Sequence, residues 1–81
     1  MSWSLTDERE QRRWFLFEAC TELGFCIPPK VQDELILRDS ISRKELVRAV
    51  IEAEGIFPVH LESYEHFDAL MEICEKFVDA P

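Results

Sequence analysis

Apolar residues recur at helical spacing in several segments of this sequence, and glycine or proline separates one segment from the next. The breaks fall at Gly24, Pro28, Pro29, Gly55 and Pro58. Strict alternation of apolar and polar residues, the pattern of a half-buried strand, is almost absent. These features predict an all-α fold, a small single-domain helical bundle of three main helices plus one short helix.

Local signals predict the bounds of the first two helices. Ser4 or Thr6 can cap the first helix, whose apolar positions continue to about residue 23, where Gly24 is suited to the left-handed conformation that ends a helix. Proline is favoured at the first helical position, so Pro29 is expected to open the short second helix, which ends at about residue 37.

The strongest local signal lies between residues 42 and 45, where Ser-Arg-Lys-Glu matches a capping box. It predicts a third helix that begins after Ser42 and ends before Gly55. The last helix is expected to begin at Leu61 or Ser63 and to end at residue 78, with its apolar positions on one face.

Composition narrows the classes of protein. The 81 residues carry 17 acids and 9 bases, a net charge of −8, which opposes the phosphate backbone and argues against a direct nucleic-acid binder. No apolar run is long enough to span a membrane, and the N-terminus does not resemble a secretory signal, so a cytoplasmic location is predicted. We expect one domain over residues 1–81, with residues 1–4 and 79–81 frayed.

The charge is concentrated in the C-terminal part of the chain. Residues 1–48 hold nine acids and eight bases, a net charge of −1, whereas residues 49–81 hold eight acids and one base, a net charge of −7. In the last predicted helix, five acids spaced three or four residues apart would form one stripe: Glu65, Asp68, Glu72, Glu75 and Asp79. Such stripes are most often only the solvated face of an amphipathic helix, and the alternative is a docking surface for a basic protein.

Aromatic residues give a second candidate surface. On the first helix Trp14 projects away from the apolar stripe, and Phe17 lies near the direction of Trp14. Exposed aromatic residues are candidates for interaction hot spots. Burial against the second helix or against the connector over residues 25–27 is the favoured interpretation for Phe17, and for Trp14 burial and exposure are evenly balanced. A self-contact through Trp14, which would give a homo-oligomer, is a further alternative.

The sequence gives little evidence for a catalytic site or a metal site. Cys20, Cys26 and Cys74 are too few for a disulfide framework and are expected to be free thiols. Cys26 could pair with His60 or His66 as nucleophile and base, but the Cys and His spacings do not fit a structural zinc site. No catalytic residue, metal or cofactor is predicted, and we expect that the protein is not an enzyme.

These observations rank three functions. The first is a small protein-interaction module, an adaptor, regulator or accessory subunit, that docks a basic partner through the acidic face of the last helix. The second is an inhibitor that imitates nucleic acid and occupies the basic groove of a nucleic-acid-binding protein. The third is a Cys/His enzyme or metal site. No direct contact with nucleic acid or membrane is predicted.

Overall fold

The computed structural model describes residues 7–79, and within this range every regular element is a helix. The elements, in chain order, are α1 (Glu8–Leu23), α2 (Pro29–Leu37), α3 (Arg43–Ala53), the 3-10 turn η1 (Leu61–Ser63) and α4 (Phe67–Phe77). The predicted all-α fold class is confirmed. None of the helices in the described range is both long and apolar enough to cross a membrane.

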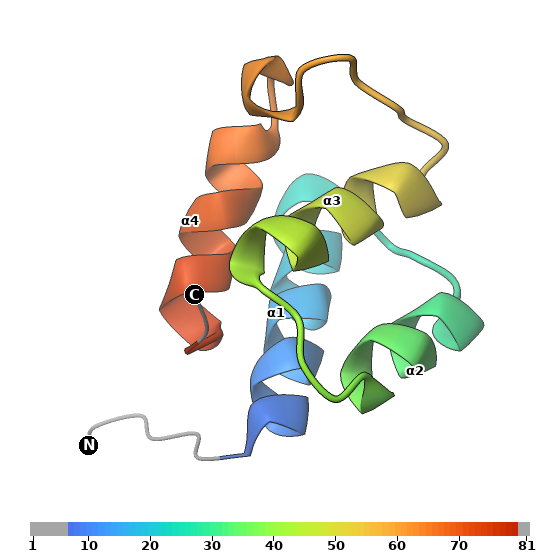
Figure 1. Cartoon of the computed structure of the whole chain (residues 1–81), viewed down its shortest axis with the longest axis vertical. Coiled ribbons are helices and arrows are strands. Elements are labelled where there is room, and N and C mark those ends of the chain that lie inside the picture. Colours follow the sequence, from blue (N-terminus) through green and yellow to red (C-terminus); the bar gives the residue numbers. More distant parts are fainter. Residues whose placement is uncertain (1–6, 80–81) are drawn as a thin grey trace.

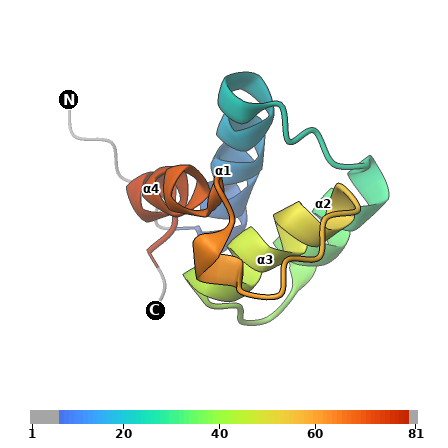
Figure 2. The same cartoon turned by 90° about the horizontal axis from the view of Figure 1, so that it is seen from above.

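Helix α1 occupies the middle of the molecule. It packs against α2 on one side and against α4 on the other, and α4 runs antiparallel beside it (Figure 1). Helix α3 crosses in front of α1 in that view and packs against α4. Seen from above, α4 and α2 lie to either side of α1, and α3 spans the space between them and packs against α4 (Figure 2). Neighbouring helices therefore cover two sides of α1. The side that carries Trp14 and Phe17 stays exposed to solvent.

Capping side chains set the ends of α1 and α3. The side chain of Asp7 accepts a hydrogen bond from the Arg9 backbone N–H, 2.9 Å away, so Asp7 is the N-cap of α1. The caps predicted for α1, Ser4 and Thr6, lie outside the described residues. Gly24 ends the helix with a φ of 79°, and its N–H donates to the carbonyl of Cys20.

The serine half of the predicted capping box at the start of α3 is confirmed, whereas the Glu45 carboxylate accepts from the Ser42 hydroxyl and not from the Ser42 backbone N–H. Ser42 Oγ accepts a hydrogen bond from the Glu45 backbone N–H at 3.2 Å and donates to Glu45 Oε1 at 3.0 Å. Ile41 and Leu46, which flank the cap, are both buried. These contacts are local in sequence, which explains why the residue pattern alone located the start of this helix.

The single last helix predicted from residue 61 or 63 to residue 78 is wrong in its first third. The chain instead makes the turn η1, continues through Tyr64 and Glu65, and begins α4 only at Phe67, after the N-cap His66. Leu61 and Phe67 are both buried, so the chain bends in order to place both side chains in the core.

One apolar core joins the four α-helices. Its fully covered members include side chains from α1, α2, α3 and α4: Phe15, Leu35, Leu46, Val47, Val50, Ile51, Leu70 and Cys74. The connector after α1 contributes the buried residues Phe25 and Ile27. With the interior filled in this way, the candidate functional residues lie on the outer surfaces of α1, α2 and α4.

Candidate functional site

Three of the five predicted acids lie on one exposed face of α4. Asp68, Glu72 and Glu75 are spaced four and three residues apart within the helix, and all three are exposed. We call these three residues the α4 acidic row. None of them forms an ion pair with another residue between 7 and 79. The base nearest in sequence, Lys76, places its ammonium nitrogen 5.1 Å from the centre of the Phe77 ring.

The other two predicted members of the stripe lie outside α4. Glu65 precedes the helix, and its Oε1 lies 3.2 Å from His66 Nε2. Asp79 follows the C-cap Val78, and its backbone N–H donates to Gln11 Oε1 at 3.0 Å. The expectation of a five-membered helical stripe is therefore corrected to a row of three, because the helix is shorter at both ends than predicted.

A neighbouring acid shows what pairing does to a carboxylate. Glu62 in η1 accepts a hydrogen bond from Lys44 Nζ at 2.8 Å. This hydrogen bond, with smaller contributions from the backbone and from the positive charge of Lys44, lowers the pKa of Glu62. Glu62 is thus tied to α3, whereas the carboxylates of the α4 acidic row are left to solvent.

The two candidate aromatic residues of α1, Trp14 and Phe17, both reach the surface. The side chain of Trp14 is 37% exposed, and that of Phe17 is 55% exposed, so the favoured prediction that Phe17 is buried is wrong. Helix α2 packs beside this face of α1 and leaves Phe17 uncovered. The Trp14 ring stacks on Phe77 of α4 at a centroid distance of 6.5 Å and meets the edge of Phe17 at 5.9 Å.

A groove of about 490 Å³ runs between α1 and α2 beside these rings. Trp14, Phe17, Pro29 and the buried residues Leu16 and Ile36 supply its apolar surface. Polar and charged side chains stand along its edge: Glu10, Arg13, Gln32 and Asp33. No sequence pattern predicted this groove, because its two walls come from different helices.

Cys20 and Cys26 form a disulfide, which corrects the prediction that both are free thiols. Gly24 turns the chain at the end of α1, so the six-residue separation brings their Cα atoms to 4.3 Å. Disulfides are uncommon in a reducing cytosol, so this pair does not support the cytoplasmic location predicted from the sequence. Cys74 is free and buried.

The Cys/His alternative loses its nucleophile in this arrangement, since the sulfur of Cys26 is bonded to Cys20. His66 lies edge-on to the rings of Phe25 and Tyr64, with centroid distances of 5.8 and 5.6 Å. Burial raises the pKa of the neighbouring Tyr64 hydroxyl. Between residues 7 and 79, no group of three or more Cys, His, Asp or Glu side chains is placed to hold a metal ion.

Sequence reasoning missed Arg12, a buried polar residue that joins α1 to α2. Its side chain is almost fully buried, and Nη1 donates to three carbonyl oxygens at the end of α2, those of Leu35, Ile36 and Arg38, at 3.1, 3.0 and 2.5 Å. Its Nη2 lies 3.8 Å from Glu8 Oε2. Position 12 continues the apolar stripe of α1 toward its N-terminus, and that placement was the available signal.

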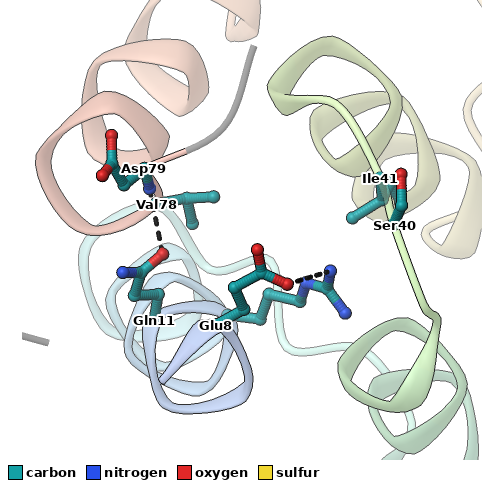
Figure 3. Close-up of a pocket in the computed structure, with 7 residues that line it drawn as sticks. Glu8, Gln11, Ser40, Ile41, Val78 and Asp79 are labelled. Carbon is teal, nitrogen blue, oxygen red and sulfur yellow. Dashed lines mark hydrogen bonds and ion pairs between the residues drawn. The ribbon is translucent and has the colours of Figure 1, made fainter. Parts of the chain in front are cut away.

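Gln11, beside Arg12, ties α1 to the chain after α4. It is also buried, and Figure 3 shows its side chain pointing toward the backbone of Asp79, across from Ser40 and Ile41. The small pocket that these residues line measures about 90 Å³. Its polar groups serve contacts between elements of this chain, so we assign it a structural role.

Comparison of the chain with protein-family models, with curated proteins and with solved structures finds no match.

Proposed function

We propose that this protein is a protein-interaction module that binds a basic partner through the α4 acidic row. The observation that supports this function is that Asp68, Glu72 and Glu75 are exposed on one helix face and form no ion pair within residues 7–79. Like charges at this spacing cost a helix about 0.2–0.5 kcal/mol for each pair, a cost that a basic partner would remove.

The position of this face in the fold also favours docking. The opposite side of α4 holds the buried residues Phe67, Leu70 and Cys74, which pack into the core and fix the helix in place. A partner therefore meets carboxylates carried on a helix that is already in place, so the ordering cost on binding is limited to these three side chains. Residues 49–81 carry a net charge of −7, which would speed the encounter with a basic surface.

The test is a pull-down with the wild type and with the triple reversal Asp68→Lys, Glu72→Lys and Glu75→Lys. The matched control reverses one aspartate and two glutamates that are exposed elsewhere, Asp39→Lys, Glu22→Lys and Glu52→Lys, so both variants have the same net charge. We expect the α4 variant to lose a partner that the control variant retains, with helical circular dichroism intact in both. Equal capture by the two variants would reject the α4 acidic row as the docking face.

The salt dependence of capture gives a second readout. Exposed ion pairs are screened at high ionic strength, so a partner held by the α4 acidic row should be released by about 0.5 M salt. Competition by duplex DNA for the captured partner would favour the alternative function, an inhibitor that imitates nucleic acid. Undiminished capture in the presence of DNA favours ordinary docking.

A further inference from the structure

The groove between α1 and α2 is a second exposed surface, separate from the α4 acidic row. Its volume of about 490 Å³ lies within the range of roughly 300–1,000 Å³ typical of binding clefts. Leu16 and Ile36 form a buried apolar floor, and Phe17 exposes more than half of its side chain beside them. A partner that covers apolar surface of this kind removes it from water, and this burial stabilises the complex.

The aromatic wall of the groove is held in place by its neighbours. The Trp14 ring stacks on Phe77 at 6.5 Å, and Phe17 meets the Trp14 ring edge-on at 5.9 Å. Aromatic residues that are already positioned lose little conformational freedom when they are covered, and they are enriched among interface residues that carry most of the binding energy.

The charges around the groove select its occupant. Glu10 and Arg13 pair with each other at 3.6 Å, whereas Asp33 is exposed and forms no ion pair within residues 7–79. The edge of the groove is therefore negative, as is the whole chain, with a net charge of −8. A second copy of this chain, a nucleic acid or an anionic membrane would be repelled, and a basic polypeptide would be attracted.

The secondary structure limits how that polypeptide binds. The described residues contain no strand, so there is no sheet edge to which an extended peptide could add. Recognition then depends on side chains that enter the groove, which suits a helix with apolar residues on one face. We propose that the groove between α1 and α2 binds an amphipathic helix of a partner protein, with its apolar residues against Phe17 and Ile36 and a basic residue against Asp33.

The test uses a fluorescently labelled peptide of about 14 residues, roughly four helical turns, with leucines at helical spacing and lysines elsewhere. A control peptide of the same composition alternates leucine and lysine, and so cannot gather its leucines on one helical face. We expect the first peptide to bind at least about tenfold more tightly than the control peptide at near-physiological salt. Equal affinity for the two peptides would overturn the proposal.

Two variants probe the groove itself. Phe17→Ser removes the exposed ring and should weaken binding of the amphipathic peptide by about tenfold, because this ring is the largest exposed apolar contact. Asp33→Lys reverses the edge charge on a different helix and should weaken binding by about threefold or more. Both positions are exposed, and unchanged circular dichroism verifies the fold. Affinity within about twofold of the wild type in both variants would overturn the proposal.

Changes in the NMR chemical shifts of the backbone amides show whether the peptide binds in the groove or on the α4 acidic row. Binding in the groove should perturb amides in residues 13–20 and 29–36, and the two triple reversals with equal net charge should bind the peptide alike. Shifts confined to residues 68–75 would overturn the groove and support the α4 acidic row. A concentration-dependent dimer that Phe17→Ser abolishes would also overturn the proposal, since a second copy would then be the occupant.

Discussion

Helices α1 and α4 lie side by side in the molecule, yet they differ in how closely burial follows the apolar pattern. Helix α4 buries Phe67, Leu70 and Cys74 and exposes its acids, as an amphipathic pattern predicts. Helix α1 buries three apolar residues of its stripe, but it also buries Gln11 and Arg12 and leaves Trp14 and Phe17 partly exposed. Both helices pack against two others, so the difference indicates that the apolar pattern does not decide burial alone, and that polar groups on a neighbouring helix also contribute.

The neighbour that decides the face of α1 is the C-terminal end of α2. A helix end leaves carbonyl oxygens without partners, and buried carbonyls must be satisfied. Arg12 supplies the donor for three of them. Its positive charge also suits the negative end of the helix dipole, so the buried guanidinium is stabilised where it lies.

The largest effect is predicted for a substitution that removes the hydrogen bonds of Arg12 to the end of α2. Arg12→Met keeps the length of the side chain but removes the donor, which leaves buried carbonyls at the end of α2 unsatisfied. We expect the free energy of unfolding in urea to fall by about 3 kcal/mol. The control Arg13→Met, at an exposed position, should change it by less than about 0.5 kcal/mol. Similar losses in the two variants would show that Arg12 does not organise α1 and α2.

The second prediction concerns the far end of α1. Reduction of the disulfide between Cys20 and Cys26 releases a loop closed over a separation of six residues. Because a short closed loop restricts the unfolded chain, we expect reduction to lower the free energy of unfolding by about 2 kcal/mol. The double variant Cys20→Ser and Cys26→Ser should have the unfolding free energy of the reduced wild type, and the reductant should not change it. If the reductant leaves the unfolding free energy of the wild type unchanged, the disulfide does not stabilise the fold.

The third prediction tests a purely local contact in the part of the molecule that the sequence described well. Ser42→Ala removes the hydroxyl that caps α3, and we expect a loss of about 1 kcal/mol in unfolding free energy. Ser40→Ala, in the exposed connector before α3, is the matched control and should be nearly neutral. A loss of similar size at Ser40 would mean that the effect does not come from the cap.

The smallest predicted effect concerns Cys74, a buried group on α4 that is neutral at pH 7, in contrast to the buried cation Arg12 on α1. Burial in the apolar face of α4 raises the pKa of the Cys74 thiol to about 12. The neutral thiol contributes its full stability below the unfolded pKa of about 9, and that stability is lost as pH rises toward 12. Between pH 8 and pH 9.5 the unfolding free energy should fall by about 0.8 kcal/mol more in the wild type than in Cys74→Ala. Parallel pH profiles of the two proteins would contradict the raised pKa.

The sequence predicted those features of the fold that depend on interactions between residues close together in the chain. The Pro29 start of α2 and the Ser42 cap of α3 were predicted because each depends on residues within one helical turn. The acids of α4 were predicted to be exposed for a similar reason, since they lie opposite a strong apolar stripe. Glu65 was misplaced because the burial of Leu61 and Phe67 bends the chain before α4, and that burial depends on the rest of the core.

The sequence by itself determined the all-α class, the breaks between helices and the concentration of negative charge toward the C-terminus, because periodicity, capping and charge counts are local properties. Only the tertiary structure decided that Arg12 is buried, that Phe17 is exposed, and that α1 and α2 enclose a groove. Each of these outcomes depends on which helix lies beside which, and that is set by long-range packing and by carbonyl groups at the end of another helix.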